Sequence, residues 1–348
     1  MKYTVEIPHY PGSLKTMGGM VRLMRLVNDL TTVELPHYRP HTGGIKDTVT
    51  LVQLYGPPVH LRIQKTYPHI NYATVEFGVP YSVGLPDNTF PESKYVITYS
   101  DTPYGRELTG LPQIGKAAIY MLSYGMAIER ERANVLNPKF TVMTTTKRTK
   151  QLIEAEGVRC HQVGFGLNTE DFYIDSDIKR KTYAALLYHW APDKRYALGV
   201  DIVDQLCDMN KIEGVITFGA NLAYDKARHP KKLIKHYSEA TSIQVREVFN
   251  QCSVFIMPSV SEGLSLTPFE ATLCGCPSML CDGALGDLYF PEANCKWVQK
   301  DNKQAFLRAA EDILSHDYSQ LYRQDMIERC RPFTWANTVA NIKEVLET

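Results

Sequence analysis

The sequence predicts an α/β protein in which two doubly wound parallel sheets, each covered by helices, face each other across a cleft. The chain has 348 residues, more than one core of about 100–200 residues requires, so we expect two domains. Strand-like apolar segments alternate with helix-like amphipathic segments, and one polar, charge-rich stretch at 167–183 interrupts this order. We therefore place the domain boundary near residue 178 and expect ligands at the carboxyl ends of the strands.

The first half of the chain opens with a predicted strand, a glycine-containing loop and a predicted helix. The strand covers 3–7, and the helix covers 20–30, where five apolar side chains recur at helical spacing. Further strands are predicted at 48–55, 95–100, 140–146 and 160–166, and further helices at 114–136 and 148–157.

The second half repeats the alternation of strand and helix. The predicted strands lie at 184–190, 214–220, 253–259 and 277–282, and the predicted helices at 197–209, 243–252 and 303–316. Strands separated by helices in this way are typical of a parallel sheet with right-handed crossovers.

The composition excludes several functional classes. Lysine plus arginine number 38 and aspartate plus glutamate 38, so no net field attracts a polyanion, and nucleic acid is not an expected partner. The sequence has no apolar run approaching the roughly 20 residues of a membrane helix, and the opening "MKYTVEIPHYPG" does not have the pattern of a signal peptide. We therefore expect a cytoplasmic protein whose eight cysteines are buried free thiols.

The stretch "SEGLSLTPFEATLCGCPSML", residues 261–280, carries two glutamates eight positions apart. Glu270 has a structural explanation, because Thr267, Pro268 and Glu270 fit the N-cap, N1 and N3 positions of a capping box. A role in binding a ligand is equally open for it. Glu262 has no such explanation, since it follows a buried strand, where a carboxylate is either solvated or directed into the cleft.

The loop between the two glutamates suits a phosphate group. It ends at a helix amino terminus, whose free N–H groups and positive dipole favour anions. A glycine at position 263 lets the backbone approach a ligand closely. Backbone amides would bind phosphate, Glu262 sugar hydroxyls and Glu270 a ribose, which describes a site for a sugar diphosphate. The loop residues are Gly263, Leu264, Ser265 and Leu266.

The segment "VFIMPSVSEGLSLTPFEATLCGCP" resembles the signature of family 4 retaining glycosyltransferases, in which two glutamates are separated by seven residues. That family has the GT-B fold of two Rossmann-like domains. The resemblance implies hexose transfer from a nucleotide-sugar donor to a glycan, lipid or protein acceptor, without a metal or other cofactor. It also implies an acceptor-binding domain at 1–178, a nucleotide-sugar domain at 179–330 and a final helix at 331–348 that returns to the first domain.

The resemblance extends to a basic pair that binds the donor diphosphate. In "LLYHWAPDKRYALGVDIV", Lys194 occupies the position of the family's lysine, while His189 stands where an arginine is expected. Either Arg195 supplies the second cation, or the site binds phosphate more weakly than is usual in the family.

Other positions also fit the family pattern. Gly18 and Gly19 resemble the glycine pair of the first loop, near the donor phosphate, and Gly219 ends a strand on the donor side. Asp101 lies where the family lines the acceptor side, although an aspartate beside Thr102 and a proline also suits a turn. Lys194 and Glu262 are the principal catalytic candidates, with Asp101 as the third.

Competing motifs have simpler explanations. A D-x-D at 175–177 fits a solvated linker, and His60 and His69 lack the cysteine pair or H-E-x-x-H pattern of a zinc site. The basic run 229–236 is a solvated surface or a contact for a phospholipid or phosphorylated acceptor, which would make the protein peripheral to a membrane. A nucleotide-sugar epimerase on the same fold and a non-catalytic sugar-nucleotide binding protein remain as alternatives.

Overall fold

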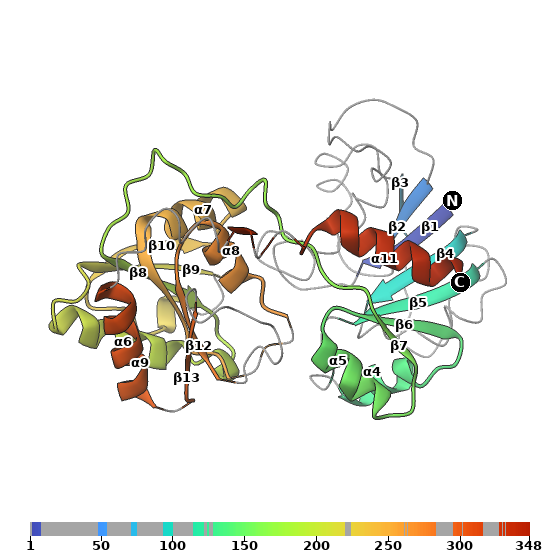
Figure 1. Ribbon diagram of the computed structural model, residues 1–348, viewed down its shortest axis with the longest axis horizontal. Helices are drawn as coiled ribbons and strands as arrows, with labels where there is room; N and C mark the ends of the chain where they lie inside the picture. Colours follow the sequence, from blue (N-terminus) through green and yellow to red (C-terminus); the bar gives the residue numbers. More distant parts are fainter. Residues whose placement is uncertain are drawn as a thin grey trace. The chain divides into compact units, whose positions relative to one another are not determined.

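The computed structural model contains two compact units, each built on a parallel sheet (Figure 1). The first unit comprises the described residues up to Gly166 together with Phe333–Thr348, and the second comprises those from Leu167 to Pro332. The described residues are 2–7, 48–53, 71–74, 93–99, 114–121, 124, 128–219, 224–260, 262, 264–282, 295–300, 302–315, 327–328, 330 and 332–348.

The segment after Gly166 packs with the second unit, so the division falls earlier in the chain than residue 178. Arg180 donates hydrogen bonds to the carbonyl oxygens of Phe249 (3.2 Å) and Cys274 (2.8 Å). The amide of Asp175 donates to Oδ1 of Asn250 (2.8 Å). The polar residues of this stretch suggested a solvated linker. In the structure, several of their polar groups instead bond to backbone and side-chain atoms of the second unit.

Seven parallel strands form the sheet of the first unit, in the order β3-β2-β1-β4-β5-β6-β7. The elements are β1 (Lys2–Ile7), β2 (Thr48–Gln53), β3 (Asn71–Thr74), β4 (Ser93–Tyr99), β5 (Ile114–Met121), α4 (Ile128–Val135), β6 (Phe140–Thr144), α5 (Lys147–Glu154) and β7 (Cys160–Gln162). The helix predicted at 20–30 lies outside the described residues.

The single helix predicted at 114–136 is wrong, because this stretch contains the strand β5 and, after it, the helix α4. β5 lies inside the sheet between β4 and β6, and its last five residues, 117–121, are all buried. A strand buried on both faces reads as a continuous apolar run without alternation. Alanine and methionine also favour helices, so the local sequence alone suggested the wrong element.

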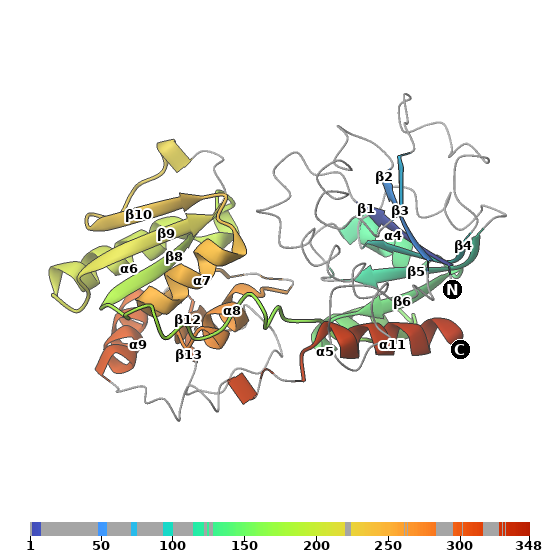
Figure 2. The ribbon, with the colours of Figure 1, turned by 90° about the horizontal axis from the view of Figure 1, so that it is seen from above.

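The carboxy-terminal helix α11 (Trp335–Glu347) belongs to the first unit, where it lies alongside β5 and β6 (Figure 2). Lys116 Nζ donates to the carbonyl oxygen of Leu346 (3.1 Å), and Asn341 Nδ2 donates to that of Val163 (3.1 Å). The helix begins at a capped terminus, since the Thr334 side chain accepts from the third residue of the helix.

Six parallel strands form the sheet of the second unit, in the order β10-β9-β8-β11-β12-β13. The elements are β8 (Tyr183–Tyr188), α6 (Tyr196–Asp208), β9 (Gly214–Gly219), β10 (Leu233–Ser238), α7 (Ser242–Gln251), β11 (Cys252–Met257), α8 (Thr267–Leu273), β12 (Ser278–Cys281), β13 (Cys295–Val298) and α9 (Lys303–Ser315), with 3-10 turns η1 (Pro192–Lys194) and η2 (Tyr224–Lys226). β10 is an edge strand that was not predicted, because none of its six residues is buried and it overlaps the basic run 229–236.

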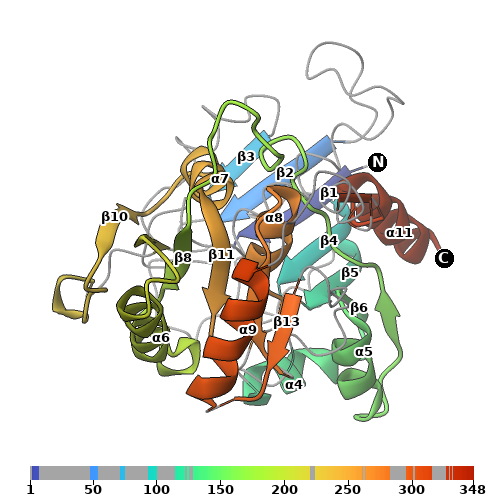
Figure 3. The same ribbon diagram turned by 60° about the vertical axis from the view of Figure 1, so that its left-hand side comes forward.

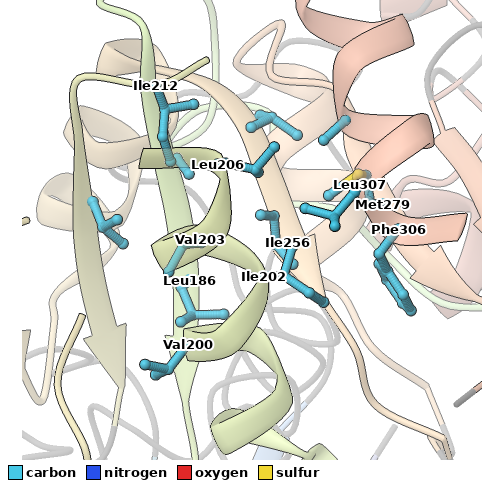
Figure 4. Close-up of a cluster of buried hydrophobic side chains, with 14 of the residues drawn as sticks. Leu186, Val200, Ile202, Val203, Leu206, Ile212, Ile256, Met279, Phe306 and Leu307 are labelled. Atoms are coloured by element: carbon cyan, nitrogen blue, oxygen red, sulfur yellow. The ribbon is translucent and has the colours of Figure 1, made fainter. Parts of the chain in front are cut away.

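Helices cover both faces of this second sheet, α6 and α9 on one and α7 and α8 on the other (Figure 3). The core between the sheet and the α6–α9 layer is apolar and closely packed (Figure 4). It contains Leu186, Val200, Ile202, Val203, Leu206, Ile212, Ile256, Met279, Phe306 and Leu307. This packing gives the loops at the carboxyl ends of β8 and β11 a rigid base.

The seven cysteines whose surroundings the structure describes are free thiols, and all are buried. Burial raises the pKa of Cys160 to about 12 and that of Cys252 well above its usual value. Burial and a raised pKa suit Cys160 and Cys252 to packing.

Candidate active site

The strand order of the second sheet creates a topological switch point between β8 and β11. From β8 the chain passes through α6 to β9 on one side, whereas β11 lies on the other side. The loops that leave the carboxyl ends of β8 and β11 therefore diverge, and open α/β sheets bind ligands at such a point.

The loop between β8 and α6 has a closely defined conformation. Helix α6 approaches β8 so closely that a Cβ atom at Gly199 would lie 2.5 Å from Leu186 Cδ1. Arg195, between η1 and α6, adopts left-handed backbone angles (φ 53°, ψ 39°) that non-glycine residues rarely adopt. The amide of Val260, after β11, donates to the carbonyl oxygen of Asp193 (2.9 Å), so the two loops are joined directly.

Lys194 and Glu262 meet across the switch point. Lys194 Nζ lies 3.0 Å from Glu262 Oε2 and 3.3 Å from Asp193 Oδ2. The Lys194 and Glu262 side chains are only 16% and 12% exposed, so the pair is much less hydrated than a surface salt bridge. The two principal catalytic candidates, 68 positions apart in the sequence, thus form one partly buried ionic group.

His189 lies in the same loop as Lys194, but it is not a second cation. Its Nδ1 accepts a hydrogen bond from the amide of Ala191 (3.0 Å), and an Nδ1 that accepts carries no proton. Burial and then the charge of Lys194 lower the pKa of His189, against the opposing effect of Asp193 and Glu262. The imidazole therefore does not supply the positive charge that an arginine would carry at this position.

Trp190 was not identified from the sequence, although a tryptophan directly after a buried strand is a usable signal. Its side chain is 58% exposed, and its ring stacks on that of His189 with centroids 5.6 Å apart and an angle of 20°.

Gly219 occupies the end of β9, paired with Tyr188 of β8. Its φ of +149° and a Cβ position only 2.1 Å from the Tyr188 carbonyl oxygen exclude any other residue without a backbone shift. Gly219 therefore determines how closely β9 approaches the residue that precedes His189.

The capping box predicted as one explanation of Glu270 is wrong. Helix α8 begins at Thr267, its N-cap is Leu266 with helical angles (φ −82°, ψ −22°), and no side chain caps it. Thr267 lies inside the helix and cannot act as the N-cap. Of the preceding residues, Leu264 and Ser265 are buried, and Ser265 Oγ lies 3.6 Å from Met257 Sδ, so these two side chains face the core.

Several predicted positions lie outside the described residues: Gly18, Gly19, Asp101 and Gly263, together with His60 and His69. Within the described ranges, there is no group of three or more His, Cys, Asp or Glu side chains that could hold a metal ion. In the same ranges, no helix is both long and apolar enough to cross a bilayer. Independence of a metal stays a prediction.

The basic run 229–236 is partly neutralised. Lys231 Nζ pairs with Asp208 (2.7 Å), and the preceding Arg228 pairs with Asp201 and with Asp204 (2.8 Å for Asp204), all three carboxylates on α6. This favours the reading of the run as a solvated surface.

Comparison with known proteins adds a family match and a fold. Residues 200–316 match the family model described as glycosyl transferases group 1. This segment runs from α6 to the end of α9 and includes Glu262 and Glu270, while Lys194 precedes it. No curated protein sequence matches the chain.

The whole chain resembles solved structures of low sequence identity. A sucrose-phosphate synthase from Thermosynechococcus elongatus is 13% identical with a TM-score of 0.73, covering 99% of this chain and 98% of that one. The Anabaena protein HepE, in complex with UDP and glucose, is 11% identical with a TM-score of 0.74 and coverages of 100% and 99%. A glycosyltransferase from Rickettsia africae is 10% identical with a TM-score of 0.75 and coverages of 99% and 97%.

These neighbours confirm the predicted fold class, which is the GT-B fold of two Rossmann-like domains. The family match covers the part of the second unit that contains the two glutamates, and it indicates a glycosyltransferase domain in this segment. The type of transfer and its substrates are treated below as proposals.

Proposed function

We propose that the protein transfers a hexose, with retention of anomeric configuration, from a nucleotide-sugar donor to a glycan, lipid or protein acceptor. The observation that carries the proposal is the ion pair of 3.0 Å between Lys194 and Glu262 at the switch point of the second sheet. The solved HepE structure holds UDP and glucose, and another neighbour is a UDP-forming trehalose-phosphate synthase, which supports a nucleotide-sugar donor.

Lys194 is the proposed partner of the donor diphosphate. Without ligand, its ammonium group is held by the carboxylates of Asp193 and Glu262. An incoming diphosphate competes for Lys194 with more negative charge than either carboxylate. The positioned cation then stabilises the charge that builds on the leaving group, a type of contribution that typically reaches several kcal/mol.

The same displacement of Lys194 by the diphosphate would free Glu262 to bind the donor sugar. Once the diphosphate draws Lys194 away, the carboxylate is available to accept hydrogen bonds from hydroxyl groups of the donor sugar. In the transfer step the bond between the anomeric carbon and the leaving phosphate oxygen breaks, and the acceptor oxygen forms its bond on the same face. The acceptor proton passes to the leaving phosphate, so the step is balanced without a further reactant.

Glu270 is proposed to accept hydrogen bonds from the ribose of the donor. Because no side chain caps α8, the capping box does not account for this residue. Its side chain is partly exposed within a helix whose neighbouring residues are buried. Arg195, directly before α6, is the second proposed cation of the diphosphate site.

The test is nucleotide release from a panel of UDP-, GDP- and ADP-sugars without acceptor, for the wild type and Glu262→Ala. Slow release from one donor that is lost in the variant is the expected result. Glu213→Ala, an exposed carboxylate before the amino end of β9, is the matched control and should behave as wild type. Equal release by Glu262→Ala and wild type would contradict the role of Glu262.

Retention is tested separately on the product. With the identified donor and an accepted sugar alcohol, the anomeric proton coupling of the product should report the same configuration as the donor. An inverted product would overturn the retaining mechanism and leave the donor assignment intact. Conversion of the donor sugar without any acceptor would instead indicate an epimerase.

A further inference from the structure

The imidazole of His189 is held in one orientation by two independent contacts. Its Nδ1 accepts the amide hydrogen of Ala191 at 3.0 Å, two residues further along the chain. Its ring lies nearly parallel to that of Trp190, with the centroids 5.6 Å apart. The hydrogen bond restrains the ring in its plane, and the stacked Trp190 ring restrains it from one face. Binding of a ligand therefore costs little further side-chain entropy.

The hydrogen bond to Nδ1 also determines where the proton is. A neutral imidazole has one donor and one acceptor nitrogen, and Nδ1 is the acceptor here, so the proton resides on Nε2. The charged groups that face the ring are Lys194 and Asp193 from η1 and Glu262 from the loop after β11. Burial of the ring and the positive charge of Lys194 keep it neutral.

Nε2 is the ring nitrogen that the Ala191 amide does not contact. In the portion of the chain covered by the structure, Nε2 of His189 makes no hydrogen bond, while Nδ1 is engaged. The ring follows the carboxyl end of β8 at the switch point, beside the proposed diphosphate partner Lys194. A phosphate oxygen accepts from a neutral N–H without the cost of desolvating a further cation.

We infer that His189 is a neutral donor whose Nε2–H binds a phosphate oxygen of the nucleoside diphosphate, with Trp190 and the Ala191 amide as the groups that orient it. At this position the site thus gains a neutral donor in addition to its proposed cations. This inference rests on the proposed function, because it assigns a further ligand contact to the same site.

The first test reads the tautomer directly, without activity. In protein labelled with 15N-histidine, the His189 signals are identified by their loss in His189→Gln. At pH 7.5 we expect a protonated Nε2 and an unprotonated Nδ1, and a shift of the Nε2 signal on addition of nucleoside diphosphate but not of the nucleoside. A proton on Nδ1, or on both nitrogens, would overturn the inference.

The second test measures binding of UDP, GDP and ADP by calorimetry, using the one that binds wild type most tightly. His189→Phe and His189→Gln both remove Nδ1, the atom that accepts from the Ala191 amide, but only glutamine keeps an N–H donor at similar reach. We expect about tenfold weaker binding for His189→Phe and a loss within about threefold for His189→Gln. Equal losses in the two variants would show that the N–H donor contributes nothing.

Two controls separate the possible failures. Affinity for the parent nucleoside and the melting temperature should be the same in both variants, which excludes a general disturbance of the loop. If Lys194→Met loses diphosphate binding while His189→Phe keeps it, the present inference fails and the proposed function stands. If wild type binds none of the three diphosphates, both fail.

Discussion

The loops that follow β8 and β11 occupy equivalent places on the second sheet but carry opposite chemistry. The β8 loop contributes the cation Lys194, the neutral ring of His189 and the exposed Trp190. The β11 loop and the helix after it contribute the carboxylates of Glu262 and Glu270. Positive charge from one loop holds negative charge from the other at 3.0 Å, so in the proposed site each loop binds a different part of a sugar diphosphate.

The largest predicted effect is that of removing the cation from the β8 loop. Lys194→Met leaves Asp193 and Glu262 facing the diphosphate without a compensating charge. Transfer should fall about 10²–10³-fold, and affinity for the nucleoside diphosphate should also drop. Steady-state kinetics and calorimetry measure the two losses, with Lys211→Met, which removes a surface pair with Glu311, as the control. Unchanged diphosphate binding in Lys194→Met would contradict the role of Lys194 as the cation that binds the diphosphate.

Removal of the carboxylate from the β11 loop should give a different pattern. Glu262→Gln should lower kcat about 10²-fold, because the sugar loses a charged hydrogen-bond acceptor in the transition state. Affinity for the diphosphate should stay the same or rise, since Lys194 loses a competing partner. A parallel loss of diphosphate affinity in Lys194→Met and Glu262→Gln would remove the functional distinction between the loops.

Gly219→Ala probes the base of the β8 loop from the neighbouring strand. The new Cβ would lie 2.1 Å from the Tyr188 carbonyl oxygen, at a φ of +149°. We expect a loss of about 2 kcal/mol in the stability of the second unit. Thermal unfolding provides the measurement, and Gly214→Ala is a useful contrast, because its closest side-chain contacts are atoms of the partly exposed Ile234. Equal melting temperatures for Gly219→Ala and wild type would contradict the close approach of β9 and β8.

Glu270→Gln should have a smaller effect that is confined to binding. Loss of one charge-assisted hydrogen bond to ribose predicts about five- to tenfold weaker nucleotide binding. The melting temperature should not change, since α8 has no side-chain cap. Thr267→Ala is the control and should leave both quantities unaltered. A lower melting temperature in both variants would revive the capping box.

The smallest predicted effect is on the pH dependence of stability. The folded-state pKa of His189 is lowered from its ordinary 6.5, so the unfolded chain takes up a proton first as the pH falls. The stability from this residue is complete above 6.5 and is lost progressively below it. Melting temperatures between pH 7.5 and 5.5 should therefore fall more steeply for wild type than for His189→Gln. Equal slopes would indicate that the ring is not held neutral.

Much of the fold could be predicted because the relevant signals are local. The helical spacing of apolar residues located α6, α7 and α9, and apolar runs located β8, β9, β11 and β12. Two errors have the same cause, which is that burial is decided outside the segment. β5 is buried on both faces and shows no alternation, while the edge strand β10 has no buried residue and resembles a basic loop.

The candidate site, like the fold, could be predicted only in part from the sequence. Residue type and position after an apolar strand identified Glu262 and Glu270 as candidates, and the family resemblance added Lys194 and His189. Only the tertiary structure decided that Lys194 contacts Glu262, that Nδ1 of His189 accepts the Ala191 amide hydrogen and that α8 begins without a side-chain cap. Each of these properties depends on which atoms the fold places within about 3 Å of one another, and short-range hydrogen bonds and ion pairs at that distance cannot be read from spacing along the chain.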